Sequence, residues 1–398
     1  MTSGRLTSVM LVAGLAAGSW LLRTGVDAAD GAKPVPAQAG AKQIPYFEYD
    51  ETFPKPLPNN WTLGTVVGIA TEAKTDHIWL VHRGGTIRPD ELNAQHNPPL
   101  GECCVKAPPV IELDYAGNVI QGWGGPAPEY DWPTDGAPSP DPTGGGGPSG
   151  MHSVYVDSKD FVWITATGGQ DGQMLKFTRK GKFVLQIGKT GVGKPDSNNP
   201  DTMNKASGVK VSGGEVYVSD GYGNRRVVVY DAETGKYKRH WGAYGKRPDD
   251  SKPFKYDPNK PADQFSTPHG IEVSRDGLVY VADRNASRLQ VFKLDGTYVA
   301  ERMIEPQTLN GSVFGVGLSP EPGQRWVYIP DGRNERVWIL ERKTLEIVGS
   351  FGCSGHAGGC MTTPHSIDVD KRGNIYIGET WEGKRVQRYL YKGLRTRS

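Results

Sequence analysis

Short runs of alternating apolar and polar residues recur along the chain in a fixed order. The clearest copy begins at His269 and continues with three further runs, residues 277–283, 288–292 and 296–301. Turn-forming Asp-Gly pairs separate these runs. The pattern predicts four short antiparallel strands joined by tight turns. Related copies begin near Val66, His152, Ser207, Phe314 and His365.

The six copies start about 45–60 residues apart, with a longer gap after the first. We predict an all-β, six-bladed β-propeller with one blade per copy. An array of β-sandwiches is the alternative, but such an array would not require the same motif to recur at the same position in all six copies. The last copy stops after its third strand near Tyr389, and residues 45–50 have strand character. We expect this N-terminal strand to close the ring, in a domain spanning residues 44–392.

Two long segments interrupt the repeats. Residues 124–150 are rich in proline and glycine and are expected to form an inserted loop between the first two blades. A second long loop is expected over residues 244–264. Both loops could cover the mouth of a central channel or lie on the surface without a role, and the sequence does not choose between these alternatives.

Composition narrows the class of protein. Glycine accounts for 53 and proline for 30 of the 398 residues, which is above average but below the range of disordered chains. The net charge of +2 gives no indication of a nucleic-acid partner, because proteins that bind nucleic acids usually carry a clustered basic face. After the N-terminal segment, no apolar run reaches the roughly 20 residues that span a bilayer. We expect a monomer with no transmembrane segment once the signal is removed.

The N-terminus reads as a targeting segment. Arg5 precedes an apolar stretch, Val9 to Leu22, and Val26-Asp27-Ala28 resembles a cleavage site. We predict a signal peptide over residues 1–28, a disordered tether over 29–43, and a secreted or periplasmic protein. A single uncleaved anchor is the alternative.

An exported chain can oxidise its four cysteines. Cys353 and Cys360 flank a glycine-rich segment that is short enough to close as a loop. Cys103 and Cys104 are adjacent, and a bond between neighbours is geometrically awkward. Three pairings are possible and the sequence does not choose among them. The spacing does not match common zinc–thiolate sites.

Histidine recurs at the first position of the innermost strand in alternate blades. Around the ring this position carries His152, Ser207, His269, Phe314 and His365. Alternate blades lie about 120° apart and their innermost strands face the axis, so three imidazoles would converge there. Three histidines with an open fourth position suit a catalytic zinc, although iron or copper would also accept them. The alternative is a repeat-specific cap in which each imidazole bonds a backbone carbonyl.

The second strands should end at the same face of the ring. Their ends carry Arg83, Tyr222, Arg284 and Arg333. Guanidinium groups bind carboxylates in a forked geometry, and a phenol beside a dication can act as a base. We predict functional roles for Arg83, Tyr222 and Arg284, and interpret Arg333 as a solvated salt-bridge partner.

The segments SDGYGNRRVVVYD, FSTPHGIEVSRDGLVYVADRNASRLQVF and TPHSIDVDKRGNIYIGE resemble NHL-repeat propellers. More specifically, they resemble the lyase domain of peptidylglycine α-amidating enzymes, over roughly residues 61–389. The resemblance implies a peptidyl-α-hydroxyglycine α-amidating lyase, which cleaves a carbinolamide into a peptide amide and glyoxylate. It also implies that His152, His269 and His365 bind zinc, that Tyr222 is the base, and that Arg83 and Arg284 hold the carboxylate and stabilise developing charge.

Three positions depart from the family pattern. Ser366 replaces an aspartate that binds a structural calcium, which makes calcium doubtful here. Gly223 replaces a cysteine, and the Arg284 motif lacks flanking cysteines, so the family's disulfides are not expected. Thr363 replaces a methionine of the pocket wall. No hydroxylating monooxygenase sequence is recognised in the chain, which leaves the source of a hydroxyglycine substrate unexplained.

Three functions remain in competition. The first is a zinc-dependent carbon–nitrogen lyase acting on a small-molecule or peptide carbinolamide. The second is an exported, non-catalytic propeller that binds a peptide, protein or glycan. The third is a lactonase-like hydrolase, but such sites rest on carboxylate-bound metals and no Asp/Glu register stands out as histidine does.

Overall fold

The computed structural model describes residues 43–136, 150–252 and 254–396, which belong to one compact unit, Lys42–Ser398. The predicted signal peptide, almost all of the predicted tether and residues 137–149 of the predicted 124–150 loop lie outside the described residues. Within the described ranges, no helix is long and apolar enough to cross a membrane.

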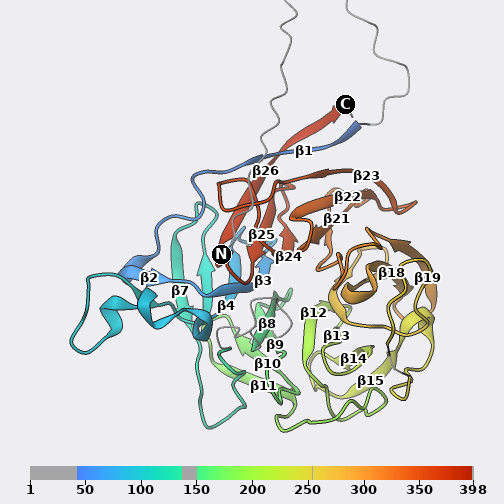
Figure 1. Ribbon diagram of the computed structural model, residues 1–398. Helices are drawn as coiled ribbons and strands as arrows, with labels where there is room; N and C mark the ends of the chain where they lie inside the picture. The colour runs from blue at the N-terminus through green and yellow to red at the C-terminus, as the bar shows by residue number, and fades with distance from the viewer. Residues whose placement is uncertain (1–42, 137–149, 253, 397–398) are drawn as a thin grey trace, which may run out of the picture. The chain divides into compact units, whose positions relative to one another are not determined.

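The described residues form a six-bladed β-propeller, as the repeat predicts. Each blade is a four-stranded antiparallel sheet, and the outermost strands β7, β11, β15, β19 and β23 lie at the periphery of the ring (Figure 1). The first three blades are β3 (Thr65–Thr71), β4 (Ile78–Arg83), β6 (Val110–Leu113) and β7 (Val119–Trp123); β8 (Met151–Val156), β9 (Phe161–Ala166), β10 (Gln173–Thr178) and β11 (Phe183–Gly188); and β12 (Ala206–Ser212), β13 (Glu215–Asp220), β14 (Arg226–Asp231) and β15 (Tyr237–Trp241).

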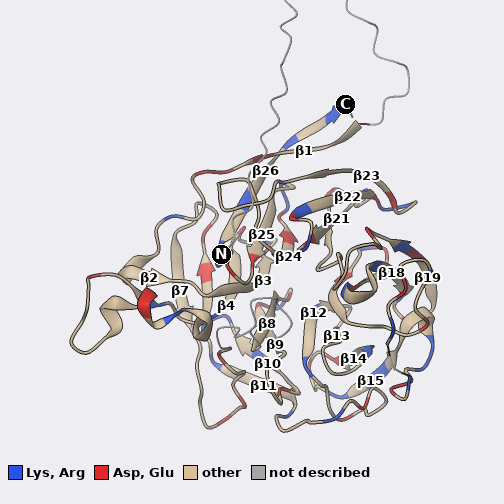
Figure 2. Cartoon of the chain, in the orientation of Figure 1, with Lys and Arg blue, Asp and Glu red and all other residues tan. Residues whose placement is uncertain are grey.

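The remaining blades follow the same order. They are β16 (Pro268–Val273), β17 (Leu278–Asp283), β18 (Arg288–Lys293) and β19 (Tyr298–Met303); β20 (Gly317–Leu318), β21 (Trp326–Asp331), β22 (Arg336–Glu341) and β23 (Glu346–Phe351); and β24 (Pro364–Val369), β25 (Ile375–Glu379) and β26 (Val386–Thr396) with β1 (Gln43–Tyr49). Basic and acidic residues are interspersed along the strands and turns of the ring (Figure 2).

The N-terminal strand closes the ring, which confirms the prediction. β1 pairs antiparallel with β26, with Gln43 opposite Thr396 and Tyr49 opposite Tyr389. Phe47 packs edge-on against Tyr328 of the fifth blade, with ring centroids 5.6 Å apart. The sixth blade therefore has four strands like the others, with β1 as its outermost strand. β26 continues to Thr396 rather than ending near Tyr389, because β1 supplies a partner along that extra length.

Alternating apolar residues fill the space between neighbouring blades. Trp79 and Val81 of β4, for example, pack with Val154 of β8 and Ile164 of β9 in one buried cluster. Residues of opposite parity face the other neighbouring blade, so each sheet is buried on both faces. This explains why the central strands of the blades are almost continuously apolar.

Short connections complete the described structure. A small parallel pair joins β2 (Trp61–Thr62) to β5 (Val105–Lys106). The 3-10 turns are η1 (Pro58–Asn60), η2 (Gly84–Thr86), η3 (Pro89–Glu91), η4 (Asn93–Gln95), η5 (Ala243–Gly245) and η6 (Arg284–Ala286). Cysteine pairing, which the sequence left open, is Cys103–Cys104 and Cys353–Cys360. The adjacent pair is bonded despite the expected awkwardness, and no cysteine flanks Tyr222 or Arg284.

Candidate metal centre

Each of the three predicted histidines occupies a bulge in the innermost strand of its blade. The register shifts between Met151 and Ser153, between Pro268 and Gly270, and between Pro364 and Ser366, so the histidine is the extra residue each time. A bulge re-aims the side chain of its unpaired residue. The same device therefore presents His152, His269 and His365 to the axis of the ring.

Small residues directly after the bulges let the innermost strands approach one another. A Cβ added to Gly270 would lie 2.7 Å from Cα of Gly315, and one added to Gly68 would lie 2.8 Å from Cα of Ser153. Distances of this size are not tolerated between a Cβ and backbone atoms. The glycines are thus a condition for bringing the three imidazoles together.

The three rings are buried and mutually close. Their centroids are 4.7, 4.8 and 4.7 Å apart, and one nitrogen of each lies within 4.8 Å of the others. The Nδ1 atom of each ring faces a backbone carbonyl of the next blade: Ser207 O at 2.7 Å from His152, Phe314 O at 2.5 Å from His269, and Val67 O at 3.0 Å from His365.

These carbonyls decide the tautomer. A carbonyl only accepts, so Nδ1 carries the proton and Nε2 keeps its lone pair. Burial, together with the positive charge of Arg83 and Arg284, lowers the pKa of His365 to about 3, and burial lowers the pKa values of His152 and His269 well below the ordinary range. Three neutral imidazoles, each oriented by a second hydrogen bond, fit a divalent transition metal. The carbonyl bond that favours a structural cap is thus also what a metal ligand requires.

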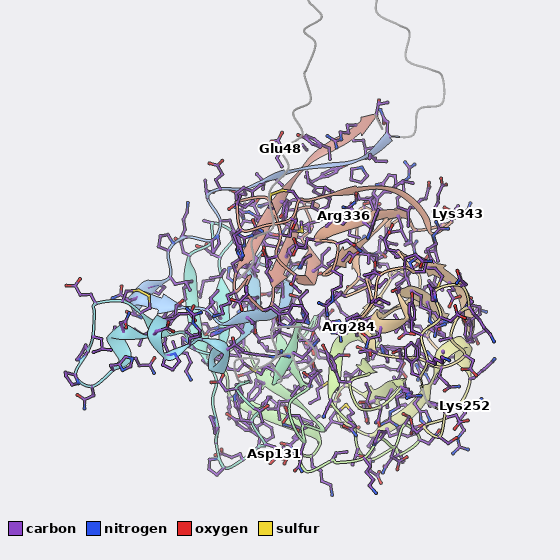
Figure 3. The ribbon with its side chains drawn as sticks, viewed as in Figure 1. Glu48, Asp131, Lys252, Arg284, Arg336 and Lys343 are labelled. Atoms are coloured by element: carbon purple, nitrogen blue, oxygen red, sulfur yellow. A yellow bond between two sulfur atoms is a disulfide. The ribbon has the colours of Figure 1, made fainter. Side chains whose placement is uncertain are left out.

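Tyr222 and Arg284 lie over the histidines. The Tyr222 hydroxyl is 3.2 Å from Nε2 of His152 and 3.1 Å from Nε2 of His269. Arg284 donates from Nη1 to the same hydroxyl over 2.7 Å, and its Cζ lies 5.0 Å above the Tyr222 ring. In Figure 3, Arg284 lies near the middle of the ring of blades. The sequence placed both residues at this face, and the structure brings them together.

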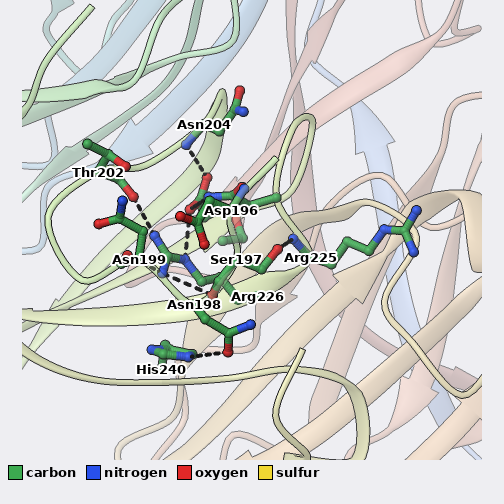
Figure 4. Close-up of polar contacts among 12 residues, drawn as sticks. Asp196, Ser197, Asn198, Asn199, Thr202, Asn204, Arg225, Arg226 and His240 are labelled. Atoms are coloured by element: carbon green, nitrogen blue, oxygen red, sulfur yellow. Dashed lines mark hydrogen bonds and ion pairs between the residues drawn. The ribbon is translucent and has the colours of Figure 1, made fainter. Parts of the chain in front are cut away.

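Buried ion pairs hold the turns that carry these two side chains. Arg226 is fully buried and donates from Nε to Oδ2 of Asp220, 2.9 Å away, two residues before Tyr222. Its other nitrogens donate to the carbonyls of Ser197, Asn199 and Thr202 (Figure 4). Arg288 pairs in the same way with Asp283, next to Arg284.

Arg83 approaches from the first blade. It is buried, donates from Nε to the carbonyl of Met151 over 2.8 Å, and from Nη2 to Oγ1 of Thr167 over 3.1 Å. Burial lowers its pKa to about 10. Its charge also lowers the pKa values of His152 and His365, which places the cation beside the candidate metal centre.

The residues around Ser366 are poorly suited to bind calcium. Calcium takes six to eight oxygen ligands, carboxylates among them, and Ser366 offers one buried hydroxyl without a hydrogen-bond partner. Further along the channel, a cavity of about 60 Å³, the ammonium of Lys210 lies 2.8 Å from a carboxylate oxygen of Glu272 and 3.8 Å from one of Asp368. The ammonium of Lys210 already pairs with both carboxylates, so calcium stays doubtful and we assign it no role.

A second cluster in the described ranges has ligand-type side chains: Glu72, His77 and Glu112. Arg179 from the second blade donates to both carboxylates. The cluster therefore already contains its cation, and an ion pair between blades accounts for it.

The structure corrects one interpretation and adds a residue. Arg333 is no solvated salt-bridge partner: it is half-buried with its Cζ 4.4 Å from the centre of the Trp381 ring. Trp381 was missed, although both residues share with Tyr222 the second position after a second strand. That shared position could have indicated that Arg333 and Trp381 lie near Tyr222. It is hard to recognise because the three residues are of different types.

Comparisons with known proteins agree with this fold. An NHL repeat matches residues 265–292. The chain is 24% identical over 375 residues to peptidyl-alpha-hydroxyglycine alpha-amidating lyase 1 of Drosophila melanogaster, covering 87% of this chain and 60% of that protein. It is 28% identical over 240 residues to peptidyl-glycine alpha-amidating monooxygenase of Mus musculus, covering 57% of this chain and 22% of that protein.

A solved structure supports the fold alone. A structural genomics protein of unknown function from Bacteroides thetaiotaomicron superposes with a TM-score of 0.50 at 13% identity, covering 83% of this chain and 70% of that one. The chain spans less than two thirds of the length of the two curated relatives. It is a six-bladed β-propeller with an NHL repeat, similar in sequence to peptidyl-α-hydroxyglycine α-amidating lyases.

Proposed function

We propose that this chain is a zinc-dependent lyase. It cleaves the C–N bond of a peptidyl-α-hydroxyglycine-like carbinolamide and releases an amide and glyoxylate. The observation that carries the proposal is the position of the Tyr222 hydroxyl, within 3.2 Å of two histidine Nε2 atoms and 2.7 Å from Arg284. The similarity to amidating lyases supports the same reaction class. We also propose that the protein acts as a secreted or periplasmic monomer.

His152, His269 and His365 would hold the zinc through their Nε2 atoms. A bound zinc ion supplies Lewis acidity, which polarises substrate oxygens and orients them. Everything else in the proposed reaction is done by the chain's own side chains.

Tyr222 acts as the base, as a phenolate. It removes the proton of the substrate hydroxyl, the C–O bond becomes the carbonyl of glyoxylate, and the C–N bond breaks with its electron pair passing to nitrogen. The amide nitrogen needs one proton to leave, and one proton has been transferred from the substrate hydroxyl to Tyr222. The reaction therefore consumes no proton overall. The guanidinium of Arg284 beside the phenol oxygen compensates its negative charge.

Arg83 and Arg284 provide the positive charge for the substrate carboxylate. Arg83 is fixed by Met151 and Thr167 and lies in a buried site, where a charge interacts more strongly than in water. A fixed cation needs no reorganisation as negative charge develops. The two arginines approach from blades one and four, so the carboxylate would be held between them.

The test measures glyoxylate released from N-benzoyl-α-hydroxyglycine by the purified chain before chelation, after chelation and after zinc is restored. We expect activity to disappear with the metal and to return with it. Bound zinc without glyoxylate would refute the lyase reaction while keeping the metal centre. Failure to bind any metal would favour a non-catalytic binding propeller.

A further inference from the structure

Arg333 is a cation with no role in the proposed reaction. It lies near the mouth of the channel, by which we mean the end at the three histidines. It lies in the turn between β21 and β22, and its guanidinium stacks on Trp381 from the turn between β25 and β26. Its Nε is buried without a hydrogen-bond partner, and no carboxylate within the described ranges forms an ion pair with it. A buried donor without an acceptor costs free energy, which a ligand's acceptor would recover.

Contacts connect Arg333 to the candidate metal centre. The adjacent Gly332 packs so closely on Phe314 that a Cβ there would lie 2.9 Å from the Phe314 ring. Phe314 in turn contacts His269 and His365, with ring centroids 5.7 and 6.0 Å apart. Arg333 therefore borders the same mouth, in the blade next to Arg284.

The two guanidinium groups are directed at different partners. Arg284 donates to Tyr222 and lies over its ring, whereas Arg333 is held on Trp381 in the sixth blade. Burial and the charge of Arg284 lower the pKa of Arg333, so the two cations repel each other across the mouth. Because the two guanidinium groups are held on different aromatic rings, each can pair with a separate anionic group.

We propose that Arg333, seated on Trp381, is a second anion-binding group that selects substrates with a carboxylate on the part that leaves as the amide. The preferred substrate is then a dianion: one carboxylate becomes that of glyoxylate, and the other belongs to the N-acyl group. Only the identity of the reacting end rests on the proposed lyase function. The presence of two anion sites does not.

The test is equilibrium binding of N-acylglycines that lack the hydroxyl and cannot react. N-succinylglycine and N-glutarylglycine carry the second carboxylate, while N-butyrylglycine and N-pentanoylglycine have the same chain lengths without it. In the metal-loaded wild type, one dianion should bind roughly tenfold more tightly than its matched monoanion, the scale of a charged hydrogen bond. Arg333→Met should abolish this difference and leave monoanion binding unchanged, and Arg333→Lys should restore part of it.

Arg336→Met is the matched control. Arg336 also stacks on a tryptophan, Trp338, at 5.3 Å, but its side chain is exposed and lies farther from the middle of the ring (Figure 3). The Arg336→Met variant should keep the preference for the dianion. A wild type without dianion preference, or a preference that survives Arg333→Met, would overturn the inference. A preference lost in Arg333→Met without glyoxylate formation from either α-hydroxy derivative would keep the inference and refute the lyase reaction.

Discussion

The two ends of the central channel are lined by the same innermost strands but differ in their chemistry. At one end, three neutral imidazoles meet Arg83 and Arg284. Three residues further along the same innermost strands lie Tyr155, Lys210, Glu272 and Asp368. Burial opposes the charged form of Lys210, but the carboxylates of Asp368 and Glu272 outweigh it and raise its pKa.

The difference separates a binding site from a structural cluster. Lys210 has its counter-charges within the fold, because Glu272 and Asp368 both pair with its ammonium. The histidine end presents three Nε2 lone pairs, and Arg284 there forms no ion pair with a carboxylate of the described residues. These lone pairs and this cation indicate where a metal and an anionic ligand would bind.

The largest effect is expected from removing one histidine. His269→Ala should reduce zinc from about one ion per chain to almost none, because two imidazoles bind zinc much more weakly than three. Elemental analysis measures the metal, and circular dichroism checks the fold. The exposed His96→Ala serves as the control. Unchanged metal content in His269→Ala would contradict the three-histidine site.

The second prediction concerns Tyr222. Tyr222→Phe should keep the metal and lower kcat by roughly 10²–10⁴-fold, the usual contribution of a general base. Steady-state glyoxylate release measures this, with the exposed Tyr237→Phe as the control. Full activity of Tyr222→Phe would remove the tyrosine from the reaction.

The third prediction breaks the opposite end of the channel. Lys210→Met leaves Glu272 and Asp368 without their cation and should lower the free energy of unfolding by about 3 kcal/mol. Metal content and kcat of the folded fraction should stay unchanged. Lys371→Met removes an exposed ammonium from Asp76, which keeps Arg372 as a second cation, and should cost less than about 1 kcal/mol. Equal destabilisation of the two variants, or loss of metal in Lys210→Met, would contradict the separation of a structural end from a metal-binding end.

The repeat allowed the sequence to predict the ring, its closure by the N-terminal strand and the convergence of three histidines. Register alone was sufficient because His152, His269 and His365 are the same residue at the same position. It was insufficient for Lys210, Glu272 and Asp368, which share a register but differ in type. Their complementarity exists only once blades three, four and six surround one axis.

Other features depend on packing that no pattern encodes. Each bulge that aims a histidine adds one unpaired residue to an otherwise regular ladder, and alternation does not reveal it. The stack of Arg333 on Trp381 joins turns of neighbouring blades. The sequence therefore predicted that the histidines, Arg83, Tyr222 and Arg284 share one face of the ring, but it did not predict the contact between Arg333 and Trp381.

The most direct measurement is anomalous diffraction at the zinc edge from crystals of the full chain grown with zinc. The account predicts one strong peak on the channel axis, about 2.0–2.1 Å from the Nε2 atoms of His152, His269 and His365. A map with no peak between these histidines, or with its main peak at Glu72, His77 and Glu112, would contradict it.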